Sequence, residues 1–124
     1  MLAPALHLCL QAIAALGAGA VPVRADFVNA PCAGEAARAL RYDPRIGAAR
    51  AIRDVAAGET IAAIPASMLP DVRPGDTLYL VARVGTATVE RAVTAVQPGR
   101  HGQALFVRTS DGRTVRAHLP EDAR

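Results

Sequence analysis

The side chains that could carry out chemistry are few in this sequence of 124 residues. Its cysteines are Cys9 and Cys32, and two of its three histidines, His101 and His118, lie in the last quarter of the chain. A thiol in contact with an imidazole can act as a nucleophile, but nothing in the sequence positions Cys32 against either histidine. Two histidines without a third ligand at matching spacing do not define a zinc site.

Three carboxylates, Asp71, Asp76 and Glu90, are the candidates for acid–base chemistry. Such chemistry needs two carboxylates that converge on a cleft with separated pKa values, and the sequence does not indicate that convergence. Asp76 directly follows Gly75, where we expect it to accept backbone N–H bonds within a tight turn. The chain has no glycine-rich phosphate loop. The sequence therefore predicts no catalytic residue, no cofactor, no metal site and a protein that is not an enzyme.

The charge of the chain is close to balanced. Fourteen arginines, with no lysine, stand against 11 acidic residues, which gives a formal net charge of +3. Binding of nucleic acid by counterion release needs several basic groups on one face, whereas these arginines are scattered and interleaved with acids. We therefore expect solvated arginines and no nucleic-acid partner.

The first 25 residues have the composition of an export signal. An apolar stretch runs from Leu8 to Ala20, interrupted only by Gln11, and is followed by Val23-Arg24-Ala25. Signal peptidase accepts small or aliphatic residues three and one positions before the cut, which here are Val23 and Ala25. We therefore predict a signal peptide over residues 1–25 with cleavage after Ala25. The tripeptide Ala18-Gly19-Ala20 offers a second cleavage site.

Two other interpretations of this segment are an uncleaved membrane anchor and a buried N-terminal helix. The apolar stretch is short for a membrane span, which needs about 20 strongly apolar residues. Cleavage after Ala25 would leave Cys32 as the remaining cysteine, without an internal disulfide. The prediction is a periplasmic protein with no stable membrane insertion after cleavage.

The rest of the chain divides into three parts. Residues 26–49 form a lead-in with a short helix expected within Gly34–Tyr42, where alanine, glutamate and leucine favour helix. Residues 50–119 consist of short β-type runs separated by glycine, proline and Asp-Gly turns, which is typical of a compact β domain. Residues 120–124 are polar and are expected to be a disordered tail.

The clearest structural signal within the β domain is a hairpin. Thr77–Val84 alternates, which predicts a half-buried strand with Leu78, Leu80, Ala82 and Val84 on one face. Gly85-Thr86 then forms the turn, and Ala87–Val96 returns as the second strand. A β domain with exposed strand edges can bind a protein partner by strand addition, although the sequence does not assign the partner-binding surface.

The order of these motifs resembles the closing SAF domain of the flagellar basal-body P-ring formation chaperone. The resemblance covers residues 50–119. It rests on these segments of the sequence: Ala51–Ile61, Met68–Asp76, Ala95–Gly102, Phe106–Arg108 and Ser110–Val115.

The resemblance implies a mainly β fold of the β-clip type, a SAF-like domain of short bent strands. It also implies a periplasmic chaperone that binds the P-ring subunit during assembly of the flagellum, without nucleotide or metal. A SAF domain of a pilus-assembly protein is an alternative within the same fold. A module that binds sugar acids and a stand-alone enzyme are alternatives from other functional classes.

Overall fold

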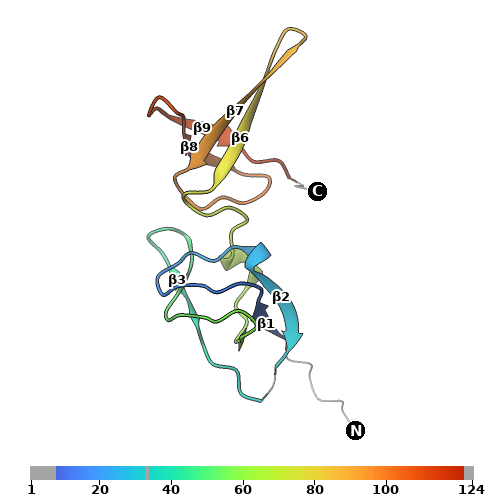
Figure 1. Ribbon diagram of the computed structural model, residues 1–124, viewed down its shortest axis with the longest axis vertical. Helices are drawn as coiled ribbons and strands as arrows, with labels where there is room; N and C mark the ends of the chain where they lie inside the picture. The colour runs from blue at the N-terminus through green and yellow to red at the C-terminus, as the bar shows by residue number, and fades with distance from the viewer. Residues whose placement is uncertain (1–7, 33, 122–124) are drawn as a thin grey trace. The chain divides into compact units, whose positions relative to one another are not determined.

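The computed structural model describes residues 8–32 and 34–121 and is mainly β (Figure 1). Three antiparallel sheets and two single-turn 3₁₀ helices make up its regular structure, with no α-helix in the described part of the chain. The chain forms two compact units, residues 1–69 (unit 1) and residues 70–124 (unit 2). The elements are β1 (Leu8–Ala12), η1 (Arg24–Asp26), β2 (Phe27–Pro31), β3 (Leu40–Asp43), β4 (Ala48–Ala51), β5 (Thr60–Ile61), η2 (Ala66–Met68), β6 (Thr77–Val84), β7 (Ala87–Ala95), β8 (Ala104–Arg108) and β9 (Thr114–His118).

Unit 1 contains a three-stranded sheet and a separate hairpin. Strand β1 lies at the centre of the sheet, between β2 and β5, and β3 pairs with β4 in the hairpin. The core of the unit is apolar, and Leu40, Val55 and Ile61 are its largest fully buried side chains apart from proline. A disulfide joins Cys9 in β1 to Cys32, 23 positions later. The link therefore fixes the pairing of β1 with the end of β2.

Two similar bends cross each other in unit 1. The first bend (Ala12–Ala20) meets the second bend (Ala51–Glu59) through a reciprocal pair of backbone hydrogen bonds. The N–H of Leu16 donates to the carbonyl of Val55, and the N–H of Val55 donates to the carbonyl of Leu16, each at 2.8 Å. Both side chains are buried, at 5% and 1% exposure.

A glycine at the equivalent place in each bend makes a second matched pair of bonds. The N–H of Gly19 donates to the carbonyl of Ala51, and the N–H of Gly58 donates to the carbonyl of Ala12, both at 2.8 Å. These glycines have φ of +84° and +83°, a conformation that costs an L-residue roughly 1–2 kcal/mol. The two bends therefore repeat one local conformation, and each needs glycine at this place.

The predicted signal segment is not a separate element in this structure. Leu16, Val21 and Val23 are buried in the core of unit 1, and Ala25 lies in η1. A cut after Ala25 would remove the central strand, the first bend and Cys9. The part of the predicted signal before Leu8 lies outside the described residues.

The predicted short helix is wrong, and Cys32, which would be a free thiol after cleavage at Ala25, is paired with Cys9 in the uncleaved chain. Cys32 is in the disulfide, and the described part of Gly34–Tyr42 contains no helix. Leu40 and Tyr42 belong to β3 instead, because pairing with β4 buries Ala39 and Leu40 completely or nearly so. Tertiary pairing here overrides the helical propensity of the segment.

Unit 2 is one four-stranded antiparallel sheet in the order β6-β7-β8-β9. Its core contains Val93, Leu105 and Val107, with Leu78 and Leu80 packed against it. The alternation predicted for β6 is confirmed at the start of the strand, where Leu78 and Leu80 are partly buried and Thr77 and Tyr79 are exposed. The predicted turn is confirmed as well, with Gly85 at φ +63° between the two strands.

The same crossing device occurs in unit 2. Val72 and Gly99 exchange reciprocal backbone hydrogen bonds of 3.0 and 2.9 Å. Gly75 and Gly102 have φ of +96° and +83° and donate to the carbonyls of Ala95 and Leu119, respectively, at 2.8 and 2.9 Å. Both units therefore contain two crossing bends, each with a glycine at positive φ, although the bond from Gly102 goes to Leu119 and not to the opposing bend.

Replacing Gly19 by alanine tests whether the first bend is part of the folded protein. We expect Gly19→Ala to lower the free energy of unfolding by roughly 1–2 kcal/mol, because alanine would be forced to positive φ. Gly17→Ala is the matched control, since Gly17 has ordinary φ and open space for a Cβ atom. Urea denaturation of the two variants measures the difference. Equal stability would show that this segment does not fold as described.

Removing the disulfide should destabilise the protein by about 3 kcal/mol, since the crosslink restricts a loop of moderate length in the unfolded chain. The double variant Cys9→Ser/Cys32→Ser tests this by urea denaturation with and without reductant. Reductant should weaken the wild-type protein and leave the double variant unchanged. A wild-type protein that does not respond to reductant would contradict the crosslink.

Candidate functional site

The β6–β7 hairpin is longer than the sheet that supports it. Strand β7 pairs with β6 from Ala87 to Thr94, but it pairs with β8 only at Thr94 and Ala95. Beyond these residues the hairpin is a two-stranded ribbon that extends past the other strands of unit 2 (Figure 1). Isolated two-stranded ribbons are marginally stable in water, so this ribbon depends on the sheet at its base.

One face of the ribbon continues the core-facing side of the sheet into solvent and is apolar apart from Arg91, which stands opposite Leu80. Ala82 stands opposite Val89, and Val84 stands opposite Ala87. Val84 is 67% exposed and Val89 is 43% exposed. The sequence predicts a half-buried strand here, and that prediction is wrong at Ala82 and Val84. The exposure of Ala82 and Val84 could have been expected from the strand lengths, because β7 is longer than β8.

The opposite face of the ribbon is mixed in character. Tyr79 and Val81 are exposed at 66% and 58%, and Val81 stands opposite Glu90. Arg83 and Thr88 form the next pair toward the turn. The ribbon therefore combines an apolar face with a face that can make both apolar and charged contacts.

The outer edge of β6 is open to another strand. Strand β6 is terminal in its sheet, with no neighbour beyond it among the described residues. A two-residue hairpin turn makes its flanking residues, here Val84 and Ala87, a hydrogen-bonded pair. Backbone groups alternate along an antiparallel strand, so Tyr79, Val81 and Arg83 direct their N–H and C=O groups outward. This edge has the backbone pattern that strand addition uses.

The carboxylates considered from the sequence have structural partners. Asp76 accepts the N–H of Arg73 at 3.0 Å, which confirms its predicted role in the turn. Asp71 accepts the N–H of His101 at 2.8 Å, and the His101 Nδ1 atom lies 3.0 Å from the carbonyl oxygen of Pro120. These contacts hold the loop after β7 against the end of the chain.

The other candidates for chemistry belong to other elements. Glu90 is on the ribbon and His118 is on β9, while Cys32 is in the disulfide of unit 1. In residues 8–32 and 34–121, no three side chains of histidine, cysteine, aspartate or glutamate gather as a group that could hold a metal ion. Of these candidates, the structure brings together Asp71 and His101, which hold the loop after β7 in place.

The turn between β8 and β9 is held by an aspartate. The Thr109 hydroxyl donates to the Asp111 carboxylate, and this hydrogen bond, with one from the backbone N–H of Arg113, lowers the pKa of Asp111. Gly112 follows at φ +86°. These contacts place one of the expected Asp-Gly turns at Asp111-Gly112 and give Asp111 a structural role.

None of the helices in the described part of the chain is both long enough and apolar enough to cross a membrane. The described fold and the ribbon together define a small, mainly β protein that presents an exposed hairpin.

No family model and no curated protein matches the chain. Crystal structures of Salmonella FlgA in closed and open forms show a distant likeness, with TM-scores of 0.39 and 0.40 at 18% sequence identity. The alignments cover 95% and 96% of this chain but 60% and 58% of the FlgA chains. The chain thus spans about three fifths of the length of the proteins that it resembles.

Substitutions can test whether the apolar side chains of the ribbon serve the stability of the fold. We expect Val84→Thr to change the free energy of unfolding by less than about 0.5 kcal/mol, as is usual for exposed positions. Leu105→Ala in the core should cost about 2–5 kcal/mol, since Leu105 is buried. Urea denaturation measures both. A large loss in Val84→Thr would show that the ribbon is packed against another part of the protein.

Proposed function

We propose that this protein is a periplasmic assembly chaperone that binds the subunit of the flagellar P-ring. The proposal joins three lines of support: the order of sequence motifs over residues 50–119, the disulfide, and the exposed β6–β7 ribbon. It involves no cofactor and no chemical reaction. The contact with the partner is made by the ribbon.

The observation that carries the proposal is the exposure of the ribbon. An apolar face formed by Val84, Val89 and their neighbours lies beside an open backbone edge. Long exposed edges with apolar side chains invite pairing with other strands, and proteins normally cover or charge them. A partner strand on the outer edge of β6 would extend the sheet and allow the partner's side chains to cover the apolar face.

The disulfide supports the location. Disulfides form and persist in oxidising compartments such as the bacterial periplasm and are rare in the cytosol. The Cys9–Cys32 link connects segments that are both part of the fold of unit 1. A periplasmic location therefore suits the chain as it folds, with residues 8–25 retained.

The test is binding of the purified P-ring subunit from the same organism. We expect Val81→Pro to weaken this binding roughly tenfold or more, because proline removes one outward N–H and so at least one backbone hydrogen bond of an added strand. Proline at an edge position leaves the pairing of β6 with β7 in place. Surface plasmon resonance measures the affinity, and circular dichroism checks the fold.

Val81→Thr is the matched control, because threonine keeps the N–H group and the β-branched shape. It should bind within about twofold of wild type, a difference worth well under 1 kcal/mol. If Val81→Pro binds the P-ring subunit as well as wild type does, strand addition on β6 is excluded. If wild type binds a pilus subunit and not the P-ring subunit, the alternative from pilus assembly replaces the flagellar one.

A further inference from the structure

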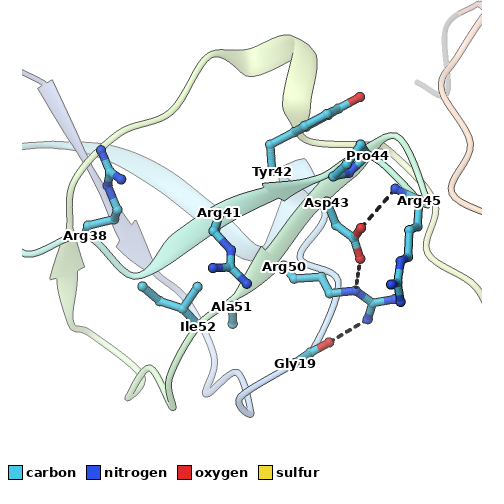
Figure 2. A pocket seen from close by; sticks show the side chains of 10 residues that line it. All are labelled: Gly19, Arg38, Arg41, Tyr42, Asp43, Pro44, Arg45, Arg50, Ala51 and Ile52. Carbon is cyan, nitrogen blue, oxygen red and sulfur yellow. Dashed lines mark hydrogen bonds and ion pairs between the residues drawn. The ribbon is translucent and has the colours of Figure 1, made fainter.

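A pocket in unit 1 is lined by an unusual number of arginines. It has a volume of about 900 Å³ and lies around the β3–β4 hairpin and the adjoining first bend (Figure 2). Its charged lining residues are four arginines and one aspartate. They are Arg38, Arg41, Asp43, Arg45 and Arg50.

Two of these arginines are direct neighbours across the hairpin. Arg41 in β3 stands opposite Arg50 in β4, and like charges in this position repel each other. Their side chains project to the same side of the hairpin, away from Tyr42 (Figure 2). The hairpin therefore concentrates positive charge on one face, although the residues are scattered in the sequence.

The single carboxylate of the pocket is already engaged. Asp43 Oδ2 accepts a hydrogen bond from Arg50 Nε at 2.8 Å, and Asp43 Oδ1 accepts one from the backbone N–H of Arg45 at 3.0 Å. Both bonds lower the pKa of Asp43, and the bond from Arg50 has the larger effect. Asp43 is thus ionised at neutral pH and offsets the charge of Arg50, which leaves an excess of three positive charges.

Arg50 is held rigidly at the wall of the pocket. Its Nη1 atom donates to the carbonyl oxygen of Gly19 in the first bend at 2.8 Å, while its Nε atom is bound to Asp43. Arg38 and Arg41 make no side-chain hydrogen bond or ion pair within the described residues, and both are exposed. The pocket therefore has one fixed cation and neighbouring guanidinium groups that are able to close on a ligand.

We propose that this pocket binds the oxyanion of a carboxylate- or phosphate-bearing ligand. Guanidinium groups form short, often bidentate hydrogen bonds with both kinds of anion. An oxyanion bound at Arg41 would relieve its repulsion with Arg50, and Arg38, which also lines the pocket, would contact another part of the same ligand. The site lies wholly in unit 1 and shares no residue with the contact proposed for the β6–β7 ribbon in unit 2.

Titration calorimetry on the whole protein tests this site at constant ionic strength, with chloride as the reference anion. The probes are inorganic phosphate, glucuronate and a hexaglutamate peptide, which represent a free phosphate, an organic acid and an acidic protein segment. We expect saturable binding of at least one probe at one site. The probe that binds most tightly identifies the source of the anion.

Two substitutions locate the binding. Arg41→Gln and Arg38→Gln should each weaken the tightest probe about tenfold, the effect of losing one charge-assisted hydrogen-bonding group. Arg116→Gln removes an equally exposed charge from β9 in unit 2 and should leave binding unchanged. The ribbon variant Val81→Pro should also bind the probe like wild type, which separates this test from that of the proposed function.

The absence of saturable binding for all three probes would overturn the proposal. An equal loss in Arg116→Gln would overturn it too, because it would show attraction to the overall charge of the protein. Circular dichroism of the arginine variants checks that each remains folded. If Arg41→Gln does not fold, the result with Arg38→Gln decides.

Discussion

The reciprocal hydrogen bonds between Leu16 and Val55 are the contact on which unit 1 depends. They hold together two bends that come from distant parts of the chain. The core forms around the buried side chains of Leu16 and Val55. Each bend turns at a glycine with positive φ, Gly19 in one and Gly58 in the other. Because this crossing holds distant parts of the chain together, short strands are enough to pair the segments on either side of it, and the described part of the unit contains no α-helix. Unit 2 repeats the device between Val72 and Gly99.

The sequence predicts the parts of this fold that have local signals. The alternation of Thr77–Val84, the Gly85 turn and the role of Asp76 are all visible in the residues alone. The first bend is not predicted, because its alanine, leucine and glycine residues lack charge and so match the composition of an export signal. Comparison of Ala12–Ala20 with Ala51–Glu59 would have been a better guide. Both segments begin with Ala-Ile and have their bend glycine at the eighth position. The second segment also contains charged residues, whereas the first has none.

The candidate sites depend on contacts that no local pattern specifies. An alternating apolar strand is normally half-buried, and whether Val84 is covered depends on how far β8 pairs along β7. The arginines of unit 1 are likewise ordinary surface residues in the sequence. The β3–β4 pairing brings Arg41 opposite Arg50, and the first bend adds the carbonyl of Gly19. Positive charge is thus concentrated by tertiary structure, in a chain whose overall charge is close to balanced.

The central place of β1 has a consequence for the order of events after synthesis. Its sheet partners β2 and β5 and the second bend all follow it in the chain. Strand β2 is close enough in sequence to pair with β1 early, whereas the pairings with β5 and the second bend join segments far apart in sequence and form slowly. Oxidation of Cys9 and Cys32 would hold β1 beside β2 while the rest of unit 1 completes the sheet.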